Sequence, residues 1–249
     1  MNRILASAGE VADNEYVELR DERFVHIRDV LQARTGDSVR IGILNGLRFD
    51  DAHIVSIDAD CCVIKLGSGI APLPSINIDL LLALPRPKCM KRLWPQLTAT
   101  GAGRIFIVNA EKVEPNYWGA QILKREAYMP LVIEGLSQSG DTAVPEIVIE
   151  RRLKPLLEDK IGHDYNDGCK LLANPGSPHL SANGSNAGIG NMRNNRLIVG
   201  VGPEGGWSKY ELDMFEQNGF RLFGFGERIL RTDTACIALI THVQTLFRR

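Results

Sequence analysis

The chain has 249 residues and a formal net charge of −1, with 44% hydrophobic and 24% charged residues. These values are ordinary for soluble globular proteins and argue against disordered and fibrous classes. A chain of this length holds one large domain, or a small domain beside a larger one. The small net charge gives no overall attraction to a polyanion, so a nucleic-acid partner would need a local basic surface.

The five cysteines include the adjacent pair Cys61 and Cys62, and no spacing matches a Cys-x-x-Cys metal or redox motif. We expect them to be buried, reduced thiols. The first residues lack the apolar core of a secretory signal, and no window approaches the ~18 uninterrupted apolar residues of a membrane span. The sequence therefore predicts a soluble, cytoplasmic protein without a membrane segment.

Residues 1–72 are predicted to form a small β-barrel or sheet with one helix. Within residues 21–34, Phe24, Ile27, Val30 and Leu31 have the spacing of an apolar helix face. Short alternating strands are expected at residues 38–45, 47–58 and 61–67. The Asn45-Gly46 pair between the first two strands favours an antiparallel hairpin with a two-residue type I′ turn.

The stretch GSGIAPLPS, residues 67–75, is rich in Gly, Pro and Ser and predicts a boundary between domains at 1–72 and 73–249. The second domain alternates apolar strands with longer helical patterns, which is typical of a mostly parallel α/β sheet covered on both faces. Strands are expected at 77–85, 104–110, 146–151, 169–174, 196–202 and 221–226. Helices are expected at 88–101, at 117–140 with an interruption at Pro130, and at 153–162, 208–219 and 233–247. The Asn-, Gly- and Ser-rich residues 175–195 predict a disordered loop.

The stretch LIVGVGPEGGWSKYE, residues 197–211, contains a G-x-G-x-x-G pattern directly after an apolar strand. This pattern is typical of dinucleotide-binding turns, but such a turn normally opens a nucleotide-binding domain. Here it lies within about 50 residues of the C-terminus, which leaves no room for that domain. A nicotinamide-binding site is therefore not favoured.

The backbone chemistry of the same stretch points to a different geometry. Pro203 and Gly206 lengthen the turn, and Ser208 with Glu211 predicts a capping box that starts the next helix. Gly219 is the expected residue just past the end of that helix. We therefore expect a strand that ends in an exposed glycine loop, rather than a diphosphate site on a helix N-terminus.

A second unusual loop, FGFGERILRTDTA, spans residues 223–235 between a short apolar strand and the last helix. It contains Arg228, Arg231 and the tripeptide Thr232-Asp-Thr234, whose side-chain oxygens suit a helix cap. Taken alone, either loop is explained by turn glycines and capping residues. Two such loops at the carboxyl ends of parallel strands meet at one edge of a sheet, where α/β proteins bind ligands.

The motifs GPEGGWS and LRTDTA resemble the signatures of the RsmE family, S-adenosylmethionine-dependent methyltransferases that modify N3 of a uridine in small-subunit (16S) ribosomal RNA. Their order and their distance from the C-terminus also agree, and ERFVHIRDVLQARTGDSVRI and LSQSGDTAVPEI agree more weakly. The resemblance implies a PUA-like β-barrel RNA-binding domain and a SPOUT methyltransferase domain with a C-terminal trefoil knot. It also implies S-adenosyl-L-methionine as cofactor and a homodimer whose substrate is ribosomal RNA of the assembled or assembling small subunit. It implies no metal.

The resemblance places the cofactor against both glycine loops. The matching positions are Gly200, Val201, Gly202, Pro203, Glu204 and Gly205 in the first loop, and Gly224, Phe225, Gly226, Ile229, Leu230, Arg231, Thr234 and Ala235 in the second.

Methylation of uridine N3 requires an accessible base and loss of the N3 proton. A fixed guanidinium suits stabilisation of the resulting anion, and Arg231 is the candidate. The alternative is a surface arginine that pairs with Asp233 or with a backbone carbonyl. Glu204 could accept the proton if it were buried, although a structural role in the turn is favoured. Methyl transfer depends mainly on positioning, so it does not require a dedicated base.

Local basic residues are the candidates for contact with RNA phosphates, although each group alone is also typical of a solvated face. They are Arg20, Arg23, Arg28 and Arg34 in the first domain; Arg86, Lys88, Lys91 and Arg92 around the helix of residues 88–101; and Arg151, Arg152 and Lys154. No role is assigned to the five histidines. The apolar residues of the last helix suit either the core or a subunit interface.

The sequence departs from the family pattern at Thr100–Gly103, at Glu111-Lys112 and at Asp141, where a Glu-Leu-Gly, a serine-arginine pair and an arginine are usual. These departures leave two alternatives open. One is a non-catalytic RNA-binding or ribosome assembly factor on the same scaffold, and the other is a methyltransferase for a different RNA.

Overall fold

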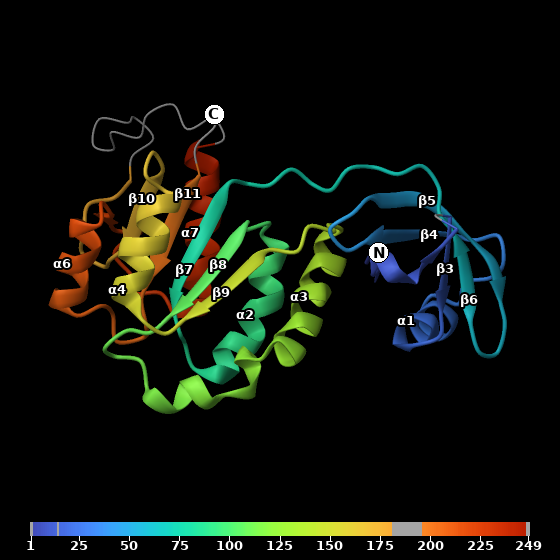
Figure 1. Cartoon of the computed structure of the whole chain (residues 1–249), viewed down its shortest axis with the longest axis horizontal. Helices are drawn as coiled ribbons and strands as arrows, with labels where there is room; N and C mark the ends of the chain where they lie inside the picture. The colour runs from blue at the N-terminus through green and yellow to red at the C-terminus, as the bar shows by residue number, and fades with distance from the viewer. Residues whose placement is uncertain (1, 14, 181–195, 248–249) are drawn as a thin grey trace. The chain divides into compact units, whose positions relative to one another are not determined.

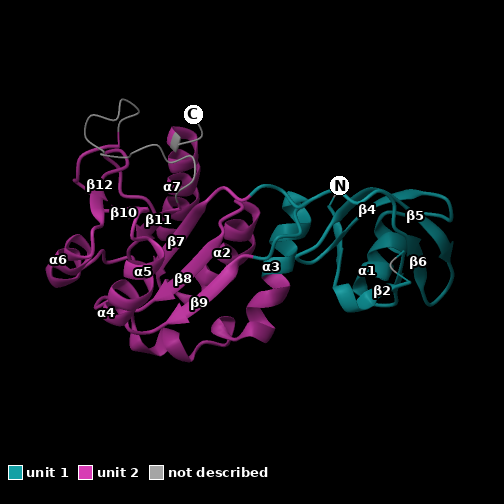
Figure 2. Cartoon of the chain, turned by 45° about the horizontal axis from the view of Figure 1, so that its top comes forward, with its two compact units in different colours: residues 1–74, 132–144 teal, residues 75–131, 145–249 magenta. Residues whose placement is uncertain are grey.

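The computed structural model describes residues 2–13, 15–180 and 196–247. The chain folds into two compact units (Figure 2). Unit 1 comprises residues 1–74 and 132–144, and unit 2 comprises residues 75–131 and 145–249. Residues 181–195, which make up most of the loop predicted to be disordered, lie outside the described residues. No helix of the described part of the chain is both long and apolar enough to cross a membrane.

Unit 1 is built on a six-stranded, nearly closed β-barrel sheet, as predicted. Its strand order is β1-β4-β5-β6-β3-β2, and every pairing is antiparallel except the parallel pair β1 and β4. The strands are β1 (Ile4–Ala6), β2 (Val11–Ala12), β3 (Tyr16–Leu19), β4 (Ser38–Ile43), β5 (Arg48–Ile57) and β6 (Cys62–Lys65), with a 3-10 turn η1 (Ala8–Glu10). The inward-facing residues Val17, Ile41, Ile54 and Ile64 are fully buried and belong to one apolar core.

The helix predicted in residues 21–34 is shorter and less regular than expected. A single α-helical turn, α1 (Glu22–Val25), continues as a π-helical turn, η2 (His26–Val30). Phe24 and Ile27 are buried as predicted, but Val30 is 66% exposed. The wider i→i+5 turn changes the angular spacing of the residues, which takes Val30 off the apolar face that a regular helix would have.

The hairpin between β4 and β5 is confirmed, but its predicted turn type is wrong. A type I′ turn needs positive φ at both central residues, and only Asn45 has it, at 57°. The Gly46 N–H donates to the Ile43 carbonyl, and the Asn45 N–H donates to the carbonyl of Thr142. Contacts with a segment distant in sequence therefore set this turn, rather than its local propensity.

Unit 2 contains a six-stranded, fully parallel sheet of order β12-β10-β11-β7-β8-β9 (Figure 1). The strands are β7 (Ile78–Ala83), β8 (Arg104–Val108), β9 (Glu146–Glu150), β10 (Cys169–Ala173), β11 (Leu197–Val201) and β12 (Arg221–Phe223). Residues of β7, β8 and β11 are almost entirely buried, as expected for central strands covered on both faces. This confirms the predicted α/β class.

The helices lie on both faces of that sheet. They include α2 (Pro87–Ala99), α6 (Lys209–Gln217) and α7 (Thr232–Phe247), together with the segment α4 (Leu153–Pro155), η5 (Leu156–Ile161) and α5 (Gly162–Asp164). Helix α7 packs on β7, β11 and α2, while α4 lies across the other face in Figure 1. The knot implied by the resemblance depends on the path from β10 to β11, and residues 181–195 of that connection lie outside the described residues.

The helix predicted at residues 117–140 is broken earlier than expected. Two 3-10 turns, η3 (Pro115–Gly119) and η4 (Gln121–Leu123), precede α3 (Arg125–Ser139). The breaks fall at Ala120 and Lys124, which have extended backbone, whereas α3 runs through Pro130. The indole N–H of buried Trp94 donates to the Ile122 carbonyl at 3.3 Å, so a tertiary contact holds the irregular segment in place.

Candidate functional site

Both glycine loops lie at the carboxyl edge of the unit 2 sheet. Because all six strands are parallel, their carboxyl ends share one edge. The first loop follows β11 and the second follows β12, while helix α2 begins soon after β7. The two glycine loops therefore meet at one sheet edge, as expected from the order of strands and loops, and this is the edge where α/β sheets bind ligands.

The first loop begins later than the sequence pattern indicated. Gly200 and Val201 belong to strand β11 and are buried, and a Cβ at Gly200 would collide with the side chain of Leu172. Gly200 is thus required for packing inside the sheet. The turn itself runs from Pro203 to Gly206, whose N–H donates to the Pro203 carbonyl at 2.8 Å and whose φ is 69°.

Gly202 lies against the ring of Trp207. A Cβ at Gly202 would come within 3.0 Å of the indole Nε1 and 3.1 Å of Cδ1. Trp207 is 6% exposed and packs edge-on against Phe215, with ring centroids 4.7 Å apart. Its buried Nε1 has no hydrogen-bond partner among the described residues. A buried N–H donor without an acceptor costs free energy, so this position suits a ligand that brings an acceptor.

The helix after this loop starts where the sequence predicted. The Ser208 hydroxyl accepts the Glu211 N–H, and the Glu211 carboxylate accepts the Ser208 N–H at 2.8 Å, which confirms the capping box. Gly219, with φ of 81°, follows the end of α6 as expected. Glu211 is buried, and its other oxygen accepts the N–H of Glu111 at 2.7 Å. The cap therefore also attaches the loop after β8, which sequence reasoning did not find.

Lys112 makes a second contact between that loop and the first glycine loop. Its Nζ donates to the Gly205 carbonyl at 2.9 Å, and its side chain lies where a Cβ on Gly205 would have to go. Of the two residues that replace the usual serine-arginine pair, Lys112 thus holds the glycine loop through a backbone carbonyl, and Glu111 binds the capping residue Glu211 through its own N–H. No local pattern could have revealed contacts between segments 93 or more residues apart.

The second loop, after β12, is held at its start and exposed at its centre. The Gly224 N–H donates to the Pro178 carbonyl at 2.9 Å, and a Cβ at Gly224 would collide with the Ser177 carbonyl. The Gly226 N–H donates to Nδ1 of His179 at 3.3 Å, so this histidine has a structural contact that was not predicted. Arg228 and Ile229 are exposed, the latter by 85%.

The residue before α2 and the first half of this helix contact the two loops. The Arg86 N–H donates to Glu204 at 3.4 Å, and the Arg92 guanidinium donates to Asp233 at 2.9 Å. Burial raises the pKa of the Cys89 thiol between them, and the nearby charges of Asp233 and Glu204 raise it further. Two loops that are separate in sequence therefore border the first half of helix α2.

The two candidate chemical groups are both exposed. Arg231 is 79% exposed, and its Nε lies 3.8 Å from Asp233, which is a loose pairing. Asp233 also accepts the N–H of Thr234 at 3.0 Å in the first turn of α7. The hydrogen bond from Arg92 is the largest cause that lowers the pKa of Asp233, so this carboxylate is ionised near neutral pH. Glu204 is also exposed, so it lacks the burial that would favour a role as proton acceptor.

The predicted RNA-contacting residues differ in how exposed they are and in how firmly they pair with carboxylates. Around the carboxyl edge, Arg86, Lys88, Lys91, Arg92, Arg151, Arg152 and Lys154 are exposed, and Arg151 and Arg152 directly follow β9. In unit 1, Arg34 is exposed, whereas Arg20 pairs with Glu18, two residues earlier, and Arg28 pairs with the adjacent Asp29. Arg23 is largely committed, because its guanidinium contacts Glu10, Asp21 and the Leu5 carbonyl.

Two sequence departures from the family pattern have structural explanations. Thr100–Gly103 follows α2 and leads into the amino end of β8, at the edge opposite to the glycine loops. Asp141 is 8% exposed, and its Oδ1 accepts the backbone N–H groups of Leu73 and Thr142 at 3.0 and 2.7 Å. Asp141 therefore organises the chain after α3 within unit 1.

The cysteines and the metal-ligand candidates add no further site. All five cysteines are free; Cys61, Cys62 and Cys236 are buried, and Cys89 and Cys169 are partly buried. Within the described ranges, no group of three or more His, Cys, Asp or Glu side chains is placed to hold a metal ion.

Comparison with known proteins decides the family. The model of the RNA methyltransferase domain matches residues 71–244. The chain belongs to the RNA methyltransferase domain family. The predicted resemblance to the RsmE family is also confirmed. The chain is 27% identical to the ribosomal RNA small subunit methyltransferase E of Treponema pallidum, over 96% of this chain and 88% of that protein. It is 26% identical to the ribosomal RNA small subunit methyltransferase E 1 of Borreliella burgdorferi, over 96% and 95%.

Solved structures share the fold of the whole chain. The ribosomal RNA small subunit methyltransferase E of Neisseria gonorrhoeae, bound to S-adenosyl methionine, superposes with a TM-score of 0.79 at 23% identity, over 99% of this chain and 98% of that one. A methyltransferase of Legionella pneumophila in complex with the same cofactor gives a TM-score of 0.75 at 20% identity, over 98% of both chains. Family members therefore combine a barrel with a parallel sheet, as this chain does.

Proposed function

We propose that the protein is an S-adenosylmethionine-dependent methyltransferase that acts on N3 of a uridine in small-subunit ribosomal RNA. Membership of the RNA methyltransferase family supports the reaction class. The names of the relatives from Treponema and Borreliella support the RNA class. The observation that carries the proposal is the position of both family motifs at one sheet edge, joined through α2.

The residues at this edge fit the proposed cofactor. Gly202 packs directly against Trp207, where a Cβ would come within 3.0 Å of the ring, and the buried indole N–H of Trp207 has no acceptor among the described residues. The turn of residues 202–205 and the loop of residues 224–235 would hold the cofactor between them. When bound, S-adenosylmethionine supplies a methyl group on a sulfonium that is ready for in-line transfer.

The chain itself would supply positioning and charge. Arg231 has a guanidinium free enough to approach the oxygens of a uracil that has lost its N3 proton, and that charge would stabilise the anion. Asp233 would orient Arg231, and Arg92 would in turn hold Asp233 in place, because both arginines contact its carboxylate. Glu204 would serve mainly to fix the turn to the start of α2, through its contact with the Arg86 N–H.

RNA recognition would use the exposed basic residues of both units. Arg86, Lys88, Arg92, Arg151 and Arg152 lie near the carboxyl edge, where they would neutralise phosphates around the target nucleotide. We assign the β-barrel of unit 1 to positioning of structured RNA. The proposal includes a cytoplasmic homodimer, in which the half-buried Ile237 and Ala238 of α7 would lie at the interface.

Two measurements test this function. The first is calorimetric titration of the whole protein with S-adenosylmethionine, in which no binding would favour a non-catalytic assembly factor. The second is mass spectrometry of ribosomal RNA from a strain that lacks the gene. We expect N3-methyluridine to disappear from the small subunit and to return on complementation. Its persistence, together with loss of a methyl group from another RNA, would move the assignment to that RNA.

A further inference from the structure

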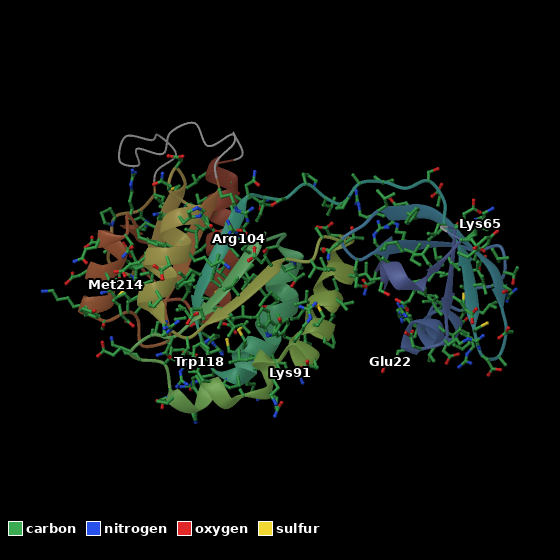
Figure 3. The ribbon with its side chains drawn as sticks, viewed as in Figure 1. Glu22, Lys65, Lys91, Arg104, Trp118 and Met214 are labelled. Atoms are coloured by element: carbon green, nitrogen blue, oxygen red, sulfur yellow. The ribbon has the colours of Figure 1, made fainter. Side chains whose placement is uncertain are left out.

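The segment after β8 carries an aromatic side chain that neither the sequence nor the family motifs single out. Trp118 lies in η3, the first of the two 3-10 turns that precede α3. Figure 3 shows it at the end of the unit 2 sheet opposite to Arg104, the first residue of β8. Trp118 therefore lies at the carboxyl edge, where both glycine loops end.

Two contacts fix the indole ring of Trp118. Its Nε1–H donates to Oδ1 of Asn109 at 2.7 Å, and Asn109 is the residue directly after β8. The guanidinium carbon of Arg151, the first residue after β9, lies 5.7 Å from the ring centroid. Both partners thus come from the ends of strands in the rigid sheet. The ring is held in one orientation, and its position relative to the sheet is fixed.

Two exposed arginines that follow β9 could meet phosphates close to this ring. Arg151 and Arg152 are exposed, and the side chain of Arg152 is 74% exposed with only a loose contact to Glu150 at 3.5 Å. On the other side of the same loop, Lys112 holds the first glycine loop through the Gly205 carbonyl. An aromatic ring with an arginine against it, on a loop attached to the proposed cofactor site, combines the two features that bind unpaired nucleotides.

We propose that Trp118 and Arg151 form a stacking platform for an unpaired nucleobase of the RNA next to the methylated uridine. The base stacks on the indole or on the guanidinium above it, and Arg151 and Arg152 meet the adjoining phosphates. Asn109 is a positioning residue that fixes the ring. This inference rests on the proposed function, because it assumes that an RNA strand reaches the carboxyl edge of the sheet.

Intrinsic fluorescence provides a direct test. The chain has three tryptophans, and Trp94 and Trp207 are only 0% and 6% exposed, whereas Trp118 is partly exposed. A short single-stranded oligouridylate should therefore quench the emission of the wild-type protein through Trp118. Trp118→Phe should bind the oligonucleotide with similar affinity in fluorescence anisotropy, using a labelled strand, but lose most of the quenching.

Affinity measurements separate stacking from simple proximity. Trp118→Ala should weaken oligonucleotide binding by about 10- to 100-fold, which is the range expected from the loss of one stacked base. Arg151→Ala should weaken it by about 10-fold and reduce its dependence on salt. The matched control is Lys160→Ala, because Lys160 also lies over an aromatic ring, 5.6 Å from Phe106, but pairs with Glu146 at the start of β9. It should bind as the wild type does.

The outcomes distinguish this inference from the proposed function. Thermal unfolding of Trp118→Ala and its binding of S-adenosylmethionine should remain close to wild type, which shows that the sheet edge is intact. If the wild type binds the oligonucleotide and Trp118→Ala binds it equally well, the platform is wrong while the methyltransferase assignment stands. If the wild type binds neither the oligonucleotide nor the cofactor, the proposed function fails and the platform fails with it.

Discussion

The two edges of the unit 2 sheet use charged residues in opposite ways. At the amino edge, Asp79 of β7 is completely buried and accepts hydrogen bonds from Arg196 at 2.5 and 2.7 Å, from the Arg104 N–H at 2.7 Å, and from the Tyr165 hydroxyl. Arg104 also donates to Asp164 at 2.5 Å. This cluster joins the starts of β7, β8 and β11, so its charges are committed to structure.

At the carboxyl edge, the arginines Arg92 and Arg231 are exposed and less completely paired. Arg231 lies 3.8 Å from Asp233, while Arg92 keeps 47% of its side chain exposed despite its contact with the same carboxylate. Charges that are not neutralised by protein partners remain available for a ligand. The same sheet therefore has one edge whose charges are committed to the fold and one edge whose arginines stay accessible, and variants at each edge should have different consequences.

The largest effect should come from Asp79→Asn. Loss of the carboxylate leaves Arg196 and the partly buried Arg104 without their shared partner, and breaking such a buried pair costs about 3–5 kcal/mol. We expect this decrease in the free energy of unfolding in urea denaturation of the whole protein. The control Asp213→Asn changes an exposed carboxylate on α6 and should remain within about 0.5 kcal/mol of wild type. Equal stability of Asp79→Asn would show that the buried cluster is not structural.

Arg231→Ala should have the opposite signature. Its side chain is mostly exposed, so the melting temperature should change little, but turnover with saturating RNA and cofactor should fall by about 100- to 1,000-fold. Arg221→Ala, at an exposed arginine on β12, is the matched control and should retain wild-type turnover. Full turnover of Arg231→Ala would exclude the proposed stabilisation of the uracil anion.

Gly202→Ala should affect the cofactor more than the fold. The new methyl group lies 3.0–3.3 Å from three atoms of the buried Trp207 ring, so the ring must shift, at a cost of about 1–3 kcal/mol. Because that ring borders the proposed cofactor position, we expect about tenfold weaker binding of S-adenosylmethionine in calorimetry. Gly9→Ala, where an added Cβ meets nothing within 4 Å, should bind normally. Unchanged binding by Gly202→Ala would place the cofactor elsewhere.

The difference between local and distant contacts also explains what the sequence could predict. The central strands of unit 2 are buried on both faces, so they appear in the sequence as uninterrupted apolar runs. Strands β1–β3 have only two to four residues each, too few for a recognisable alternation. The capping box at Ser208 is local and was predicted, whereas the irregular segment before α3 depends on Trp94, which is distant in sequence.

The candidate site shows the same division. The glycine-rich loops can be recognised in the sequence. Because each follows a strand of a predicted parallel sheet, the sequence also predicts that both lie at the carboxyl edge. The contacts of Lys112 with Gly205 and of Arg92 with Asp233 join residues 93 and 141 positions apart, and no spacing rule reveals them. Trp118 falls within the helix predicted at residues 117–140. The structure places it instead in a 3-10 turn at the sheet edge, where contacts with residues distant in sequence hold it.

The smallest effect concerns the pair between Arg92 and Asp233, and it should depend on pH. Arg92 holds the pKa of Asp233 below its ordinary value of 3.8, so the pair stabilises the fold above that pH and ceases to do so as the pH falls through the lowered value. Arg92 is nearly half exposed, so the contribution should not exceed about 1 kcal/mol at neutral pH.

A double-mutant cycle of Arg92→Ala and Asp233→Asn, followed by urea unfolding, isolates this coupling from the separate contact of Asp233 with the Thr234 N–H. We expect a measurable coupling at neutral pH and a marked decrease as the pH falls through the lowered pKa of Asp233, where this carboxylate takes up a proton. A coupling of several kcal/mol that persists in acid would mean that the carboxyl edge is as firmly paired as the amino edge. In that case Arg92 and Arg231 would not be free to meet a substrate, because the charged residues of both sheet edges would be committed to the fold.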